Sequence, residues 1–243
     1  MNARSLPMNE KAIVIPASRL YYEKVIPSIK AALVNSDVER IYLLIEDDEY
    51  PGYLPDCVTV KNARTLEKGV LNQWSGNYTR TPYVYLCLLR CAFAQIFPHD
   101  RILSLDADAI IARKIGSEPW TMGLDDNYLA GVAETKISAQ LCRPYINAGV
   151  MLLNLEQIRE NASHELIFNI NNCWYQWLEQ DCFNIVCKNH IKVLGSEWNA
   201  CQFTEPCDNP KIRHFAYEQN WLNDPLIIKY RGMDWGEVME GRT

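Results

Sequence analysis

The sequence predicts an α/β fold, and three observations near its start predict it. Residues 12–16 form a short apolar run that ends in proline, as is typical of a buried strand. Residues 22–35 then carry apolar side chains at helical spacing, with Pro27 in the first turn, where proline is tolerated. A second apolar run, residues 40–45, leads into an acidic turn. A strand, a helix and a strand joined by short links are the start of an α/β fold.

The rest of the chain continues this alternation. Further strands are expected at residues 58–60, 102–105, 129–132, 149–153, 191–194 and 211–215. Further helices are expected at residues 82–97, 155–159, 163–177 and 181–188, and a loop at residues 72–81. No repeat or linker composition interrupts the pattern, so we expect one domain over residues 1–243 with a core at about 12–221 and a C-terminal extension at 222–243.

Composition excludes several classes of protein. A net charge of −6 disfavours a nucleic-acid binder, which would need clustered Lys and Arg. No apolar run approaches the ~20 residues that span a bilayer, so no transmembrane segment is expected. Residues 1–11 lack the apolar core of a signal peptide. Nine cysteines with no C-x-x-C pair are most simply reduced thiols, and we therefore expect a cytoplasmic protein.

The candidate site starts from two carboxylates that follow the strand at residues 102–105. Asp106 and Asp108 are separated by Ala107, and in an extended chain positions i and i+2 point to the same side. Two converging carboxylates repel each other unless a cation or a shared proton relieves them. A divalent metal bound to phosphate is the functional interpretation, and a turn or capping pair is the structural one.

Two further residues have both a functional and a structural interpretation. His214 ends the last predicted strand, and an imidazole beside the carboxylates would favour Mn²⁺ over Mg²⁺. Taken alone, a structural histidine is the more common case. Arg90 lies in an otherwise apolar and aromatic helix, where it either reaches the surface along its stem or is buried and directed at an anion.

A phosphatase is an alternative built on the same aspartates. Haloacid-dehalogenase-like phosphatases also use Asp-x-Asp after an apolar strand, with the first Asp as nucleophile. They carry the pair near the N-terminus, followed by Gly-Thr or a similar pair. Here the pair is more than 100 residues into the chain and is followed by Ala109-Ile110, so this alternative is disfavoured.

Residues 105–111, Leu-Asp-Ala-Asp-Ala-Ile-Ile, closely resemble the core motif of glycosyltransferase family 8, the group of glycogenin and the lipopolysaccharide galactosyltransferases. Five more segments resemble family motifs in the same order. Arg90 matches the arginine of the family's Tyr-x-Arg segment, and residues 147–155 match its Asn-Ser-Gly-Val-Met-Leu-Ile-Asn-Leu strand. Residues 179–181 match its Asp-Gln-Asp motif, and Trp198-Asn199 match its Trp-Asn motif. Residues 214–216 match the start of its His-Phe-x-Gly-x-x-Lys-Pro-Trp tail. The resemblance covers residues 13–221.

The resemblance implies a GT-A fold, with a Rossmann-like mixed central sheet flanked by helices, and sugar transfer from a nucleotide-sugar donor, usually a UDP-sugar. Asp106, Asp108 and His214 would hold Mn²⁺, or Mg²⁺, against the donor diphosphate. The other implied site residues are Ser18 and Tyr21 near the base, Arg90, Ala107, Asn147, Ala148 and Gly149 around the donor, and Gln180 and Asp181 as catalytic residues. Family members retain the anomeric configuration; Gln180 would then lie beneath the anomeric carbon, and a leaving phosphate oxygen would take the acceptor's proton.

The chain departs from the family pattern at three points. Residues 17–21 contain Ser18 where the family has an Asp that contacts uracil. The tail after His214 lacks the usual Gly and Lys, and that Lys is expected to hold the diphosphate; Lys229, Arg231 or nothing replaces it. Glu179 replaces Asp and lengthens a pocket side chain by one methylene. A degenerate protein that binds a nucleotide sugar without turnover is therefore a second hypothesis.

The sequence leaves the acceptor open between a lipid-linked glycan, a surface polysaccharide and a protein. Residues 234–243 are acidic to neutral, which disfavours a membrane-bound acceptor. Trp74, Tyr78 and Tyr83 either stack on an acceptor sugar or pack beneath a lid, and packing is the favoured interpretation. Nothing in the sequence indicates an oligomeric state.

Overall fold

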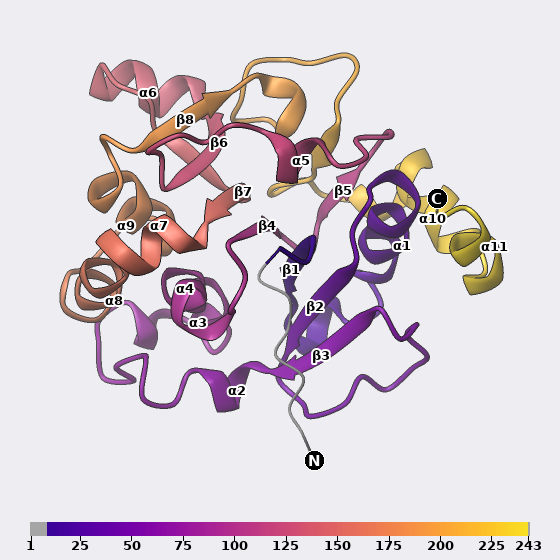
Figure 1. The fold of residues 1–243 in the computed structure, drawn as a ribbon, viewed down its shortest axis with the longest axis horizontal. Coiled ribbons are helices and arrows are strands. Elements are labelled where there is room, and N and C mark those ends of the chain that lie inside the picture. The colour runs from indigo at the N-terminus through magenta and orange to yellow at the C-terminus, as the bar shows by residue number, and fades with distance from the viewer. Residues whose placement is uncertain (1–8, 243) are drawn as a thin grey trace.

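The structure, a computed structural model, describes residues 9–242, and within them a mixed sheet of seven strands forms the centre (Figure 1). Its order is β3-β2-β1-β4-β7-β6-β8. The bounds are β1 Ala12–Pro16, β2 Arg40–Ile45, β3 Val58–Asn62, β4 Arg101–Leu105, β6 Leu129–Ala133, β7 Ile146–Asn154 and β8 Ile191–Leu194. The predicted α/β class with a mixed sheet is confirmed.

Strands β3, β2, β1 and β4 are parallel, and both faces of this half are covered. Side chains alternate along β1: Ile13 and Ile15 pack on one side, while Ala12 and Val14 pack on the other. Burial on both faces explains why β1, β2 and β4 are largely apolar in the sequence, whereas β3, at the edge of the sheet, is not.

The direction changes at β7, which pairs antiparallel with both β4 and β6. The register places Leu105 opposite Val150, so the chain leaving β4 passes beside the start of β7. As a result, the backbone N–H of Asp106 donates to the carbonyl oxygen of Gly149 at 2.8 Å. This pairing joins the aspartate motif to the Asn-Ala-Gly motif.

A second, two-stranded sheet brings His214 next to the aspartate motif. Strand β5 (Ala109–Ile111) pairs antiparallel with β9 (Ile212–His214), with Ala109 opposite His214. The backbone N–H of Phe215 also donates to the carbonyl oxygen of Asp108 at 3.0 Å. Strand β5 was not expected from the sequence because it is only three residues long and directly follows the aspartates.

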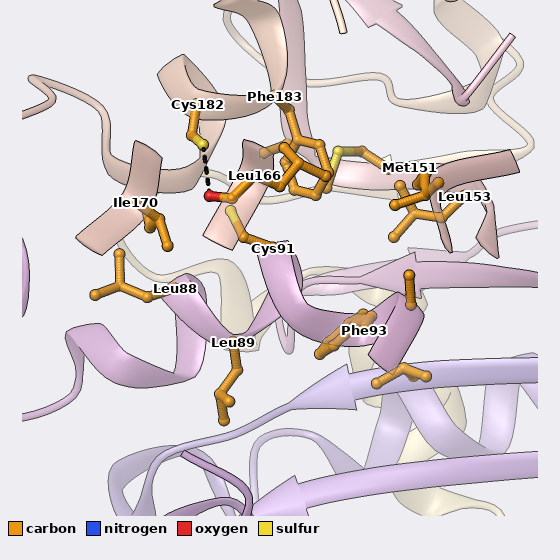
Figure 2. Packing of buried hydrophobic residues seen from close by; sticks show 14 of the residues in the cluster. Leu88, Leu89, Cys91, Phe93, Met151, Leu153, Leu166, Ile170, Cys182 and Phe183 are labelled. Carbon is orange, nitrogen blue, oxygen red and sulfur yellow. Dashed lines mark hydrogen bonds between the residues drawn. The ribbon is translucent and has the colours of Figure 1, made fainter. Parts of the chain in front are cut away.

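Helices cover both faces of the central sheet. On one face lies α1 Ile26–Asn35, with α10 Pro225–Gly232 and α11 Trp235–Glu240 packed against it; on the other lie α3 Val84–Leu88, α4 Phe93–Ile96, α7 Leu155–Asn161, α8 Ser163–Asn172 and α9 Leu178–Val186 (Figure 1). Short helices α2 Ala63–Leu66, α5 Glu118–Thr121 and α6 Thr135–Leu141 lie in the connections. Figure 2 shows the apolar layer in which α3, α4, α8 and α9 meet β7. None of the helices described between residues 9 and 242 has the length and apolar character needed to cross a bilayer.

The predicted helices at 155–159 and 181–188 differ from α7 and α9 by two or three residues at their ends, and the other three differ more. The segment expected at 22–35 is a regular helix only from Ile26, after a turn. The segment at 82–97 is broken by a 3-10 turn, Leu89–Ala92, which contains Arg90. The helix expected to reach residue 177 ends at Asn172, because the buried Asn77 amide donates to the carbonyl oxygens of Ile170 and Cys173 and satisfies the last turn.

Helices α6, α10 and α11 were not predicted. Helix α10 lies in the segment treated as a C-terminal extension, and its Ile227 and Tyr230 pack with Ala31 of α1. Apart from the half-buried Leu226, its remaining positions are exposed, so its apolar face is too narrow to stand out in the sequence.

Candidate active site

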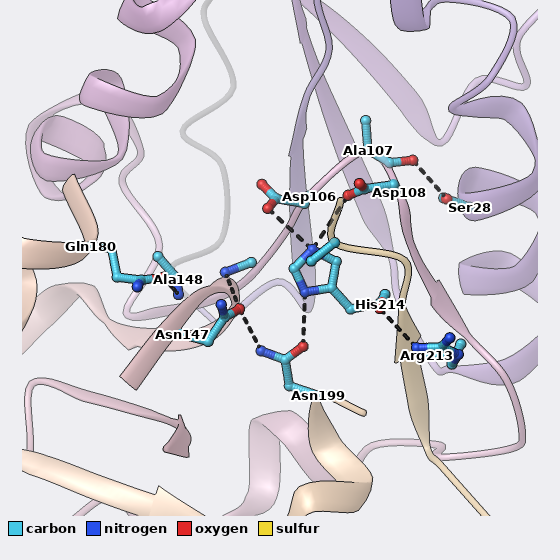
Figure 3. A network of polar contacts seen from close by, with 12 residues as sticks. Ser28, Asp106, Ala107, Asp108, Asn147, Ala148, Gln180, Asn199, Arg213 and His214 are labelled. Atoms are coloured by element: carbon cyan, nitrogen blue, oxygen red, sulfur yellow. Dashed lines mark hydrogen bonds and ion pairs between the residues drawn. The ribbon is translucent and has the colours of Figure 1, made fainter. Parts of the chain in front are cut away.

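Asp106, Asp108 and His214 converge between β4, β5 and β9. The Nε2 atom of His214 is 3.5 Å from a carboxylate oxygen of Asp106 and 3.4 Å from one of Asp108. Ligand atoms of the three residues all lie within 4.8 Å of one another (Figure 3). The sequence predicted this meeting of residues more than 100 positions apart, and the β5–β9 pairing produces it.

The orientation of the His214 ring follows from a chain of hydrogen bonds that starts at a backbone donor. The N–H of Gly149 donates to Oδ1 of Asn147 at 3.0 Å, which fixes that atom as an oxygen. The same oxygen accepts from Nδ2 of Asn199 at 2.9 Å, so the other amide atom of Asn199 is its oxygen. That oxygen lies 3.0 Å from Nδ1 of His214, which must therefore carry a proton. Nε2 is left facing the two carboxylates (Figure 3).

Gly149 leaves the space that the His214 ring occupies. A Cβ atom at position 149 would lie 2.0 Å from Cε1 of the ring. A side chain at this position and the ring cannot both fit, so the Asn-Ala-Gly motif has a steric function as well as a hydrogen-bonding one.

Arg90 is buried and its guanidinium binds carboxylates. It forms ion pairs with Asp106 and, at 3.0 Å, with Glu179, and it lies 3.4 Å from the carbonyl oxygen of Ala148. The side chain does not run along the surface. Burial alone would raise the pKa of Asp106, but the charges of Arg90 and His214 outweigh it and hold this pKa below its usual value. Burial raises the pKa of Glu179 even with Arg90 beside it.

Glu134 is a buried site residue that the sequence analysis missed. One of its oxygens, Oε1, accepts from Nδ2 of Asn147 at 2.7 Å and from Nε2 of Gln180 at 3.0 Å. Oε1 of Gln180 in turn accepts from the N–H of Ala148 at 2.8 Å. Both ends of the Gln180 amide are therefore held. The signal in the sequence was a carboxylate directly after the apolar strand β6, the same pattern that identified Asp106.

These groups line a cleft of about 1340 Å³. Of the predicted site residues, the following nine lie in its wall: Tyr21, Arg90, Asp106, Asp108, Asn147, Ala148, Gly149, Gln180 and His214. Other parts of the wall are formed by α6, by the segment at residues 176–179 and by the loop at residues 202–206.

Three predicted site residues lie behind the cleft wall. Ser18 is buried before a 3-10 turn. Ala107 is buried, and its carbonyl oxygen accepts from the Ser28 hydroxyl at 3.1 Å (Figure 3). Asp181 accepts from the Tyr145 hydroxyl at 2.5 Å and from the N–H of Trp177 at 2.8 Å, so it anchors the segment before α9.

The two cations considered as replacements for the missing tail Lys lie outside the cleft. Lys229 and Arg231 are exposed on α10. The cations that line the described cleft are instead Arg80, Arg90 and Lys136.

The Asp106, Asp108 and His214 cluster fits a divalent cation. It offers two carboxylates and one imidazole, a donor set that suits Mn²⁺. Burial lowers the pKa of His214, but its hydrogen bonds to Asp106 and Asp108 outweigh this and raise the pKa well above its usual value. The raised pKa reflects an excess of negative charge that a divalent ion would neutralise.

Comparisons with known proteins agree on the family. The chain matches the family described as glycosyl transferase family 8 over residues 55–232. It is 24% identical to the glycosyltransferase GlyA of Streptococcus pneumoniae serotype 4, over 97% of this chain and 37% of GlyA. It is 22% identical to the glycosyltransferase GlyF of the same organism, over 96% of this chain and 64% of GlyF. The chain thus spans only part of the length of these relatives.

Solved structures agree on the fold. The bifunctional glycosyltransferase WbbM superposes with a TM-score of 0.71 at 16% identity, over 98% of this chain and 53% of WbbM. The galactosyltransferase LgtC, solved with donor and acceptor sugar analogs, superposes with a TM-score of 0.67 at 16% identity, over 96% of this chain and all of LgtC. The fold is therefore the predicted GT-A fold. Because the family match spans more than half of the chain, this protein belongs to glycosyl transferase family 8.

Proposed function

We propose that the chain is a metal-dependent glycosyltransferase that moves a sugar from a nucleotide-sugar donor, a UDP-sugar, to a hydroxyl group of a glycan, lipid-linked or protein acceptor. The observation that carries the proposal is the convergence of Asp106, Asp108 and His214 at the wall of a cleft of about 1340 Å³. The complex of LgtC with donor and acceptor sugar analogs supports binding of a donor and an acceptor by a protein of this fold.

Asp106, Asp108 and the Nε2 atom of His214 would hold Mn²⁺, or Mg²⁺. A bound divalent ion would neutralise the charge that grows on the leaving diphosphate. The chain's own part is to hold the ligands in place: Asn199 directs Nε2 toward the carboxylates, and Arg90 keeps Asp106 ionised. Such preorganisation means that little rearrangement is needed when the donor binds.

The donor would lie along the wall from Tyr21 to Gln180. Tyr21 stacks on Trp221 with ring centroids 6.4 Å apart and offers a flat surface near the metal ligands. Ser18, behind this wall, is positioned to support the segment that contacts the base rather than to contact it directly. Asn147, Ala148 and Gly149 would contact the sugar and phosphates, and Asp181 would act by anchoring Trp177.

Gln180 would lie beneath the anomeric carbon and support transfer with retention. Its amide is held by Glu134 and by the N–H of Ala148, so its position is fixed before substrate arrives. The acceptor's proton would go to an oxygen of the leaving phosphate, which is on the same face as the attack. The new glycosidic bond then replaces the bond to the diphosphate.

The test is incubation of the protein with Mn²⁺ and a panel of nucleotide sugars, with and without added acceptors. We expect slow hydrolysis of one UDP-sugar, a rise in turnover with an acceptor, and loss of both with EDTA. Analysis of the product by NMR would decide between retention and inversion. The absence of hydrolysis and transfer with every donor would contradict the proposal.

A degenerate protein that only binds a nucleotide sugar is the second candidate. It is favoured by one observation: Arg90 is already paired with two carboxylates, and the other cations of the described cleft wall, Arg80 and Lys136, are exposed. Calorimetric binding of UDP and Mn²⁺ without turnover would support it.

We also propose a cytoplasmic location for this domain. All nine cysteines are free in the described residues, and several are buried as small apolar groups. Reduced thiols fit a reducing compartment. Fractionation with an antibody to the full-length protein would test it.

A further inference from the structure

Exposed tryptophans surround one end of the cleft. Trp174 is 63% exposed and Trp177 is 46% exposed, both in the segment between α8 and α9. Trp74, on the loop that lies against this segment, is 91% exposed. The expectation that Trp74 packs beneath a lid is therefore wrong. Large exposed aromatic groups of this kind indicate an interaction surface. We call Trp174 and Trp177 the tryptophan platform.

The platform is rigid because buried and charged side chains hold its backbone. Asn77, which is fully buried, donates to the carbonyl oxygen of Cys173 at 2.6 Å, and its own oxygen accepts from the N–H of Tyr175 at 3.0 Å. Arg80 donates to the carbonyl oxygens of Tyr175 at 2.6 Å and Gln176 at 2.9 Å. The backbone at Cys173, Tyr175 and Gln176 is thus held in place before a ligand binds. A fixed aromatic surface loses little entropy on binding.

The ring of Trp174 is itself positioned. The guanidinium of Arg80 lies 5.5 Å from its ring centroid, and Gly76 passes close to its edge, since a Cβ at position 76 would lie 3.4 Å from Cδ1. These contacts cover part of the ring and leave most of it open. The backbone of Trp177 is held by the Asp181 carboxylate at 2.8 Å.

The platform is continuous with the reaction cleft. Trp177, Gln176 and Arg80 line the same cleft as Asp106 and Gln180, while Trp174 continues the surface outside it. A ligand that reaches from the reacting centre to the platform must therefore be longer than a single sugar. Its outer part must also present flat apolar faces with polar edges, because the Arg80 guanidinium lies beside the Trp174 ring and Gln176 lines the wall beside Trp177.

We propose that the tryptophan platform binds sugar rings of an oligosaccharide acceptor at a distance from the hydroxyl that reacts. A pyranose ring has an apolar C–H face that packs on an indole, and its hydroxyl groups suit the guanidinium and amide nearby. This inference rests on the proposed function, and it adds that the acceptor is a chain of several sugars. Binding energy from the outer sugars would lower the KM of long acceptors.

The test compares acceptors of two lengths in the same series, maltose with maltohexaose, cellobiose with cellohexaose, and lactose with lacto-N-neohexaose. Wild-type protein is expected to have a lower KM for the hexasaccharide of the series it uses. Trp174→Ala should raise that KM about fivefold and change the KM of the disaccharide little, because one aromatic contact is worth about 1 kcal/mol. Trp174→Phe should keep most of the preference. Tyr53→Ala, at a 66% exposed aromatic residue that does not line the cleft, is the matched control and should change neither KM.

The two proposals fail in different ways. Absence of donor hydrolysis by wild-type protein contradicts the proposed function. Donor hydrolysis without a preference for the longer acceptor in any series, or an unchanged preference in Trp174→Ala, overturns the platform alone. Calorimetry with each hexasaccharide measures the platform without turnover, and equal affinity of wild type and Trp174→Ala also overturns it. Loss of association with another protein domain in Trp174→Ala, without any kinetic change, would assign the surface to protein contact instead.

Discussion

The two ends of the cleft are built in opposite ways. At one end, His214 is held by a chain of buried amides and is 2% exposed, and the buried Arg90 pairs with Asp106. At the other end, the platform and α6 present exposed side chains on a backbone that is fixed from behind. Under the proposed function, the first end can change little without loss of chemistry, whereas side chains at the second end can change and alter which acceptor binds.

The physical reason lies in burial. Removing one member of a buried hydrogen-bonded chain leaves a partner without a hydrogen bond, at a cost of about 1–3 kcal/mol. Most exposed substitutions change stability by less than about 0.5 kcal/mol. Four substitutions test this contrast, from the largest expected effect to the smallest.

Asp108→Asn should have the largest effect. It removes one of two carboxylates from the candidate metal site, so we expect donor hydrolysis to fall by a factor on the order of 1000. An independent measurement is thermal unfolding with and without Mn²⁺. At about 100 times its Kd, Mn²⁺ should stabilise the wild-type protein by ~2.7 kcal/mol, and this increment should disappear in the variant.

Asp125→Asn is the matched control for this substitution. Asp125 is exposed, lies outside the described cleft wall and has a positive φ of 49°, which Asn tolerates well. It should keep both the activity and the Mn²⁺ increment. If Asp108→Asn also keeps them, Asp108 is not a metal ligand.

Gly149→Ala tests the packing of the His214 ring. The added Cβ would lie 2.0 Å from Cε1, so the ring or the strand must move. We expect destabilisation of about 1–3 kcal/mol, measured by urea unfolding, together with weaker Mn²⁺ binding. Gly232→Ala, at the end of α10 where nothing lies within 4 Å, should leave both unchanged or raise the stability slightly. Equal unfolding curves for the two variants would show that the ring can shift at no cost.

The contrast between the two ends also explains what the sequence could predict. The strands β1, β2 and β4 are apolar runs because both of their faces are buried, so their pattern is local and clear. Asp106 and Asp108 could be found because they directly follow β4, so their position is also visible in the local sequence. By contrast, Arg90 lies where the helix is broken, and its partners Asp106 and Glu179 are 16 and 89 residues away. Such contacts leave no periodic signal.

The residues that orient the site were the hardest to predict. Glu134 follows an apolar strand just as Asp106 does, but it lacks a second carboxylate two positions on. Asn199 was part of a matched motif, yet its role depends on Asn147, which is 52 residues away. The strand at β9 was expected, but β5 is only three residues long and too short for a pattern, and the pairing of the two strands brings His214 to Asp108.

Asn199→Ala measures how much the orientation of His214 matters. The substitution removes the acceptor of the Nδ1 proton and a donor to Asn147, while the three proposed metal ligands stay. Partners of metal-bound histidines are worth about 10–100-fold in metal affinity, so we expect Mn²⁺ affinity to fall within this range. Calorimetric titration with Mn²⁺ gives the value directly. Unchanged affinity, in a variant whose stability falls by the expected amount for a buried amide, would make Asn199 a purely structural residue.

Lys136→Ala should have the smallest effect. It tests whether the exposed charge of Lys136, at the outer end of the cleft, contacts the donor diphosphate. Lys136 is exposed in the first turn of α6 and lines the cleft, so its removal should change the free energy of unfolding by less than about 0.5 kcal/mol. An exposed cation in water interacts weakly with an anion, and we expect the KM of the donor to rise by less than about threefold, with a difference that vanishes at high salt. Kinetics at low and high ionic strength measure this. A much larger and salt-resistant rise would mean that Lys136 contacts the diphosphate and supplies the charge absent from the tail, which would place part of the essential chemistry at the exposed end of the cleft.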